Sequence, residues 1–214
     1  MTPHALGELA ALHLGRVTDN QDPEGRARVK VRLLALNMEV WASVVAPSAG
    51  SGYGASFVPR VDEVVVLAFI TPELPLVLGS IWSGSSSAPG EADPQEDVYV
   101  IRTPSGVVVE LDDGDGPRVS LTTPQGYSVV VTDGGGGEIA VTRGSQSVRL
   151  TASEVSVQSS GTVSIQAGGS VSVSASMVQV DAGISKFSGV VQADTLIANS
   201  VVGASYTPGA GNIW

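Results

Sequence analysis

The chain contains no cysteine among its 214 residues, and aromatic residues make up only 5% of it. Disulfide bonds and thiol chemistry are therefore excluded, so backbone hydrogen bonds and apolar burial must hold the fold together. No apolar run approaches the roughly 18 residues of a membrane-spanning helix. The N-terminus lacks the basic start and apolar stretch of a signal peptide, and we expect synthesis and folding in the cytoplasm.

Positive charge is also scarce, since 21 acidic residues against 11 Lys and Arg give a formal net charge of −10. Most of the acidic excess falls in residues 91–115, whereas residues 155–180 carry no charge. Contacts with nucleic-acid phosphates require Lys and Arg. We therefore do not expect nucleic acid as a partner.

Residues that could carry catalysis or hold a metal ion are few. His4 and His13 are isolated, and no Ser, His and Asp set has local support as a catalytic triad. Residues 110–116 are acidic, but proline stands at two of the positions where a calcium-binding EF-hand needs a ligand. Residues 134–137 are glycines without the Gly-Lys-Ser/Thr of a phosphate-binding loop. We expect no enzyme activity, no cofactor and no metal.

A short unit, two apolar residues around one residue that is polar in seven of the copies, recurs nine times in the second half of the chain. The first four units are ten residues apart, and the later ones follow at spacings of seven to nine. Turn-forming residues lie between them, so each unit predicts a short strand with both apolar side chains on one face. The eighteen apolar residues are Val109, Leu111, Val119, Leu121, Val129, Val131, Ile139, Val141, Val148, Leu150, Val155, Val157, Val163, Ile165, Val171, Val173, Val178 and Val180.

So short a repeat cannot bury its apolar face alone and must stack on neighbouring coils or on another chain. In a monomer these faces and the strand edges would be exposed, which favours aggregation. The repeats therefore predict a β-helical rod or prism over residues 99–186, built from more than one chain.

The first half predicts a small antiparallel barrel over residues 14–84. Residues 22–25, Asp-Pro-Glu-Gly, are typical of a type I turn, and the next strand alternates basic with apolar residues. Five short strands in about seventy residues fit an OB-type Greek-key barrel. Residues 1–13 precede it as an N-terminal segment, and residues 85–98 follow as a linker. The expected strands are 14–18, 26–34, 40–46, 63–70 and 76–82.

Three blocks occur in order in this half: GRVTDNQDPEGRARVKVRL, WASVVAPSAGSGYGASFVPRVDEVVVLAF and PLVLGSIWSG. They resemble the OB domain of phage baseplate assembly protein V. That domain also occurs in the central spikes of contractile injection systems and in valine-glycine repeat proteins of type VI secretion. The ending, FSGVVQADTLIANSVVGASYTPGAGNIW, is similar to the end of short spike proteins. One departure is Val61, where the family usually has glycine, which leaves the register of that turn open.

The resemblance implies an all-β homotrimer in which the barrel is followed by an intertwined β-helical (β-prism) needle. The eighteen apolar residues would form the trimer core. The chain would be the structural central spike of a contractile tail or injection-system baseplate, joined to the hub or tail tube by its OB domain. Sheath contraction would drive it through the target envelope, with only transient membrane contact. Its final location would be a phage tail or injection particle.

The resemblance also bears on the C-terminal tip region, residues 187–214. Some spikes of the family end in a His-x-His metal site, but this region contains no histidine. We expect a separate conical tip protein of the PAAR-repeat type to cap the trimer. Tyr206, Pro208, Ile213 and Trp214 either close the last layer of the trimer or form the docking surface for the tip, and the two roles are compatible.

Two other functions stay open. A trimeric receptor-binding tail fibre also uses stacked short strands, but fibres usually end in a globular head, and residues 187–214 are short for one. An OB-fold module could bind oligosaccharide or nucleic acid, although we expect Trp41 and Trp82 in the core, leaving mainly Tyr53 and Phe57. The basic strand could be a ligand face, could meet an acidic hub surface, or could be merely solvated. Its basic residues are Arg26, Arg28, Lys30 and Arg32.

Overall fold

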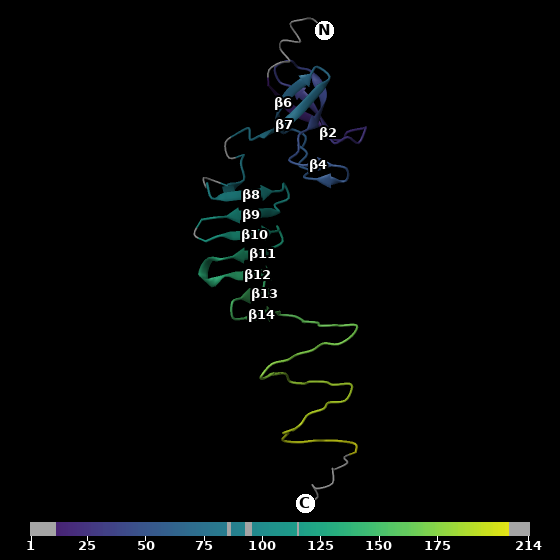
Figure 1. Ribbon diagram of the computed structural model, residues 1–214, viewed down its shortest axis with the longest axis vertical. Coiled ribbons are helices and arrows are strands. Elements are labelled where there is room, and N and C mark those ends of the chain that lie inside the picture. Colours follow the sequence, from purple (N-terminus) through teal and green to yellow (C-terminus); the bar gives the residue numbers. More distant parts are fainter. Residues whose placement is uncertain (1–11, 85–86, 93–95, 115, 206–214) are drawn as a thin grey trace, which may run out of the picture. The chain divides into compact units, whose positions relative to one another are not determined.

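The computed structural model describes residues 12–84, 87–92, 96–114 and 116–205. The chain divides into two units, Met1–Val163 and Ser164–Trp214. Every described strand lies in the first unit, together with two single-turn 3-10 helices, η1 (Gly90–Ala92) and η2 (Gly134–Gly136) (Figure 1). The all-β expectation is confirmed. No helix among the residues that the structure describes is long and apolar enough to cross a membrane.

Five strands close into the predicted barrel, in the order β1-β2-β3-β7-β6. All neighbours are antiparallel except β3 and β7, which run parallel. This confirms the OB-type barrel, and each strand lies within a few residues of its predicted position. The strands are β1 (His13–Asp19), β2 (Arg28–Leu33), β3 (Glu39–Val44), β6 (Val64–Thr71) and β7 (Leu74–Ile81).

The barrel core follows from the alternation of side chains along each strand. On β2, Val29, Val31 and Leu33 are fully buried, while the basic residues between them face outward. The two tryptophans do not lie in this core, contrary to expectation. Trp82 is 70% exposed, and Trp41 is only partly buried, because Ala42 is the residue of β3 that faces inward. The core cluster is Val17, Val29, Val31, Leu33, Ala42, Val65, Leu67 and Val77.

The turn before β6 forms without the glycine of the related domains. Asp62, not Val61, adopts the left-handed conformation there, with φ of 76°, which Asp tolerates better than most residues. Its amide donates to the carbonyl of Val17 at 2.9 Å, and Arg16 donates to its carbonyl at 3.0 Å. These bonds fix the register that the sequence left open.

Seven further strands form an antiparallel meander in chain order, β8 to β14 (Figure 1). Each strand therefore pairs with the strand next to it in the same chain. This differs from the expectation that edges in this region pair between intertwined chains. The strands are β8 (Val98–Arg102), β9 (Val108–Asp112), β10 (Arg118–Thr122), β11 (Tyr127–Thr132), β12 (Glu138–Arg143), β13 (Gln146–Thr151) and β14 (Val155–Gln158).

The described part of the second unit, residues 164–205, contains neither strand nor helix, and each of its residues is exposed. Figure 1 draws it as a ribbon without arrows. Its apolar repeats continue the sequence pattern of the sheet, but they have no ladder within the chain.

Candidate functional site

The sheet of β8–β14 carries an apolar face made of two rows of side chains. The ladder register places Val119 beside Leu111 on one side and beside Val131 on the other, and Ile139 beside Val131 in turn. The first row is Tyr99, Leu111, Val119, Val131, Ile139, Leu150 and Val155. The second row is Ile101, Val109, Leu121, Val129, Val141, Val148 and Val157.

These two rows are shielded from the sides by neighbouring strands, but they are open above. On the inner strands, Val129 is 39% exposed and Val119 is 48% exposed. No described residue therefore covers the two rows. Contiguous apolar patches of this kind mark interaction sites in soluble proteins. The rows are therefore the candidate functional site of the chain.

The opposite face of the sheet is mixed, and its charged residues are paired with one another. Its apolar residues are Val98, Val100, Val108, Val130 and Ala140. Arg118 on β10 forms an ion pair with Glu110 and another, at 3.0 Å, with Asp112. Arg149 on β13 pairs with Glu138 on β12. The sheet thus separates an open apolar side from a mixed side whose charges are paired with one another.

The structure divides the eighteen predicted core residues into two sets. Twelve of them, from Val109 to Val157, lie in the two rows. The rows also contain Tyr99 and Ile101, which are not among the eighteen although they show the same alternation. The other six are not brought together by a ladder and are more exposed than those on β9–β13, from 55% at Val163 to 77% at Ile165. These six are Val163, Ile165, Val171, Val173, Val178 and Val180.

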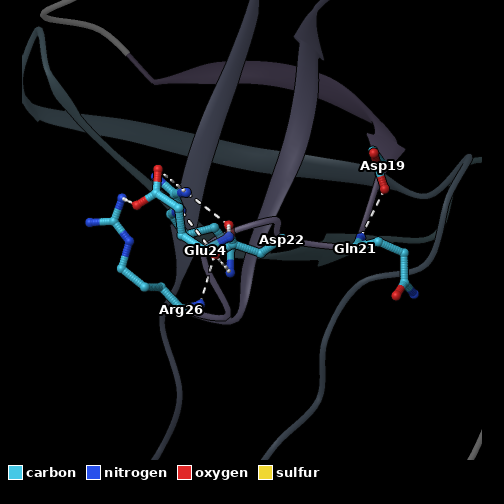
Figure 2. A network of polar contacts seen from close by, with 6 residues as sticks. Asp19, Gln21, Asp22, Glu24 and Arg26 are labelled. Atoms are coloured by element: carbon cyan, nitrogen blue, oxygen red, sulfur yellow. Dashed lines mark hydrogen bonds and ion pairs between the residues drawn. The ribbon is translucent and has the colours of Figure 1, made fainter.

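The turn between β1 and β2 is held by the carboxylate of Asp22 (Figure 2). It accepts backbone hydrogen bonds from Glu24 at 3.0 Å and Arg26 at 2.9 Å, and side-chain bonds from Arg28 at 2.8 and 3.0 Å. The guanidinium of Arg28 holds the pKa of Asp22 well below its usual range, with the backbone donors adding to the effect. Arg28 also lies over the ring of Trp41, 5.6 Å from its centroid.

The other basic residues on β2, and Arg26 in the turn before it, also form ion pairs. Lys30 and Arg32 both contact Glu39 on β3, at 3.2 and 3.0 Å, and their hydrogen bonds lower the pKa of that carboxyl. Arg26 pairs with Glu24. A polyanion or an acidic hub surface would have to compete with these carboxylates, so the geometry favours a solvated outer face over a ligand face.

Besides Trp82, two exposed aromatics of the barrel domain lie in the connection between β3 and β6. This connection contains the short hairpin of β4 (Ala49–Gly50) and β5 (Tyr53–Gly54). Tyr53 and Phe57 are 73% and 63% exposed. They line an open cleft of about 460 Å³ whose one charged lining residue is Arg26. They therefore lie in this connection and not on a face of the barrel strands, where successive bases or sugars could stack.

Among the residues that the structure describes, His13 adds no second site. His13 packs edge-on against Phe69, with 5.6 Å between ring centroids. Among the residues that the structure describes, no three metal-ligating side chains of the kinds His, Cys, Asp or Glu come together. His4, Tyr206, Pro208, Ile213 and Trp214 lie outside the described residues.

Comparison with known families concerns the barrel. Residues 13–82 match the family model described as the type VI secretion system/phage-baseplate injector OB domain. The match begins at the first residue of β1 and ends just after β7, so it covers the closed barrel. No curated protein matches the chain. The chain therefore carries a baseplate or injector OB domain, which confirms the resemblance for this part.

Proposed function

We propose that this chain, which carries the OB domain of phage baseplates and type VI injectors, is the central spike of a contractile tail or injection system. The matched domain is described as one of baseplates and injectors, which supports a location in a tail or injection particle and a structural role. In the proposal the barrel joins the hub or tail tube. The strands beyond it form a trimeric needle that pierces the target envelope.

The observation that carries this proposal is the pair of open apolar rows on the sheet of β8–β14. Three copies that turn this face toward a common axis would cover one another's rows. Completing the burial of fourteen partly exposed side chains contributes on the order of 10 kcal/mol per chain, before the cost of association is subtracted. A face-to-face dimer would also cover the rows, and the resemblance to trimeric spikes is what favours three.

The surface chemistry suits a part that moves through an envelope. Residues 155–180 carry no charge, and their polar positions are mainly Ser and Gln, which offer few sites for strong adhesion. We further propose that a PAAR-type tip protein caps the trimer at residues 206–214. Neither step requires a cofactor or a metal.

The native mass of the purified chain, measured by light scattering before and after mild heating, tests the proposal. We expect a species of three times 21.7 kDa that resists dissociation, because folding and association are coupled. A well-behaved monomer would remove the needle and leave an OB-type binding module as the better function. A stable dimer would replace the prism with a sheet sandwich.

A further inference from the structure

The two apolar rows of the sheet end at margins of opposite charge. We propose that Arg143 of one copy forms an ion pair with Asp133 of the next copy, at the corner where two sheets of the assembly meet. The inference rests on the proposed trimer. It adds the polar contact that determines which end of one sheet faces which end of its neighbour.

The margin beside the first row is acidic. Three aspartates stand two residues outside that row, and the alternation of a strand places them on the same side of the sheet. The hydrogen bonds of the ladder extend to them, since the amide of Asp113 donates to the carbonyl of Asp97 at 2.9 Å and the amide of Asp133 donates to the carbonyl of Pro117 at 3.0 Å. All three aspartates are exposed. No Lys, Arg or His among the described residues lies within 4.0 Å of their carboxylates.

The margin beside the second row carries an arginine that differs from the other arginines of the sheet. Arg102, Arg118 and Arg149 each pair with a carboxylate of their own chain. Arg143 has no carboxylate within 4.0 Å among the residues that the structure describes. Its guanidinium lies over the ring of Tyr127, 4.6 Å from the centroid. The two residues are register partners two positions outside the second row, so this cation belongs to the apolar side of the sheet.

Arg143 cannot reach Asp133 of its own chain. Its register partner is Tyr127, at the start of β11. Asp133 follows the last residue of β11, on the other margin of the sheet, and the rise of a strand puts it about 20 Å from Tyr127. The two charges therefore require two copies to meet.

A ring of copies around an axis parallel to the ladder brings opposite margins together. The strands lie across the direction in which the ladder grows (Figure 1). Contacts in such a ring are heterologous, so the second-row margin of one copy meets the first-row margin of the next. Equivalent strands lie at the same height, which leaves Arg143 at the end of β12 about one strand spacing, ~4.8 Å, from the height of β11 and its Asp133. A reversed copy would set aspartates against aspartates, which is unfavourable.

The other carboxylates of the acidic margin fit Arg143 less well. Asp97 and Asp113 adjoin β8 and β9, which lie farther along the sheet from β12 than β11 does. Glu138 begins β12, but it pairs with Arg149 on the opposite face. Asp133 precedes η2 without capping it by its side chain, so no helix cap competes for its carboxylate.

Two chains with opposite changes of charge test the pairing. Arg143→Asp leaves a carboxylate at both positions, and Asp133→Arg leaves a guanidinium at both. In a trimer of either chain alone, every corner would bring like charges together. In a trimer that contains both chains, two of the three corners would pair opposite charges.

The two variants are produced together in one cell, and native mass spectrometry sorts the trimers by composition. An exposed ion pair changes an equilibrium constant by roughly twofold to fivefold, and a mixed trimer gains two, so we expect mixed trimers to exceed their random share by at least about fourfold. Random proportions would overturn the inference and leave the proposed spike standing. A monomeric native mass of the unmodified chain would overturn both.

Arg149→Asp and Glu138→Arg, produced together in the same way, are the matched control. They introduce the same two changes of charge, but Arg149 and Glu138 pair within one chain, so a second copy restores nothing. We expect random proportions of the control trimers. Equal enrichment in the control would mean that net charge alone selects mixed trimers, and would contradict the inference.

Neutral variants cover the case in which reversed charges prevent assembly. Arg143→Gln and Asp133→Asn each remove one charge with little change in size, and each should shift dissociation of the trimer to a lower denaturant concentration. The double variant should dissociate no more easily than either single variant, because an interacting pair is lost only once. Additive shifts would mean that the two residues do not meet.

Discussion

At the scale of single residues, Gly15 shows how little room the barrel leaves. It lies on β1, opposite Leu33 on one side and Val65 on the other. A Cβ at this position would stand 2.3 Å from Cγ1 of Val31 and 2.9 Å from Cδ1 of Leu67. The residue is needed for space and not for its backbone angles.

We therefore expect Gly15→Ala to lower the free energy of unfolding of the barrel by about 1–3 kcal/mol, as overpacking of a core does. Gly79→Ala on β7 is the matched control, because a Cβ there meets nothing within 4 Å. The control should leave stability unchanged or raise it slightly. Hydrogen exchange of the β2 amides in the intact chain measures both, and equal effects of the two variants would contradict the packing argument.

At the scale of elements, the strands of the sheet alternate between an apolar and a polar side. On β12, Val141 lies in the second apolar row, beside Val129 and Val148. Its neighbour Thr142 faces the other way, beside Ser128 and Ser147. Adjacent residues of one strand can therefore separate an effect on association from an effect on the strand itself.

We expect Val141→Asp to prevent trimer formation, because a carboxylate enclosed in an apolar core costs several kcal/mol in each copy. Thr142→Asp adds the same charge to the polar face and should leave the trimer intact. Light scattering on both variants at equal concentration measures their native mass. A trimeric Val141→Asp, or a Thr142→Asp that dissociates to the same extent, would mean that the two rows do not form the subunit interface.

Element positions in the barrel could be predicted from sequence because local signals agreed. The alternation of basic and apolar residues placed β2, and the Asp-Pro-Glu-Gly turn placed its start. In the second half of the chain, the alternation of the repeats identified twelve of the residues that lie in the two apolar rows. Their role as a trimer core stays a prediction. The prediction that Trp82 lies in the core was wrong. A lone aromatic at the end of a strand has no neighbours in an alternating pattern, so the sequence does not show which face it occupies.

Features that depend on register between distant segments were out of reach. The pairing of Glu39 with Lys30 and Arg32 requires β2 and β3 to be aligned, and composition alone gave only a basic strand. The hairpin of β4 and β5 lies in a stretch of glycine, serine and alanine without alternation. The repeats themselves do not indicate which strands pair within one chain. The same pair of apolar residues is compatible with a ladder within one chain and with a ladder between chains.

At the scale of the whole molecule, the OB domain is shown by its family match, and the spike is a proposal that particles can test. We expect particles made without this chain to lack a complete baseplate and to deliver no cargo. Particles that contain it should show density for a small tip protein beyond Trp214. Full assembly and delivery in its absence would contradict the spike, whereas a bare end would contradict only the cap.

The ion pairs on the outer face of the barrel have a consequence for kinetics. At physiological ionic strength, charge is felt over a Debye length of about 8 Å, and Arg28, Lys30 and Arg32 each have a carboxylate within 3.3 Å. At distances greater than the Debye length, the basic strand and its carboxylates therefore produce only a weak electrostatic potential. Its rate of encounter with a charged partner should then depend only weakly on added salt, since electrostatic steering requires uncompensated charge. Diffusion and shape complementarity, and not long-range charge, would then govern how the barrel associates with its partner.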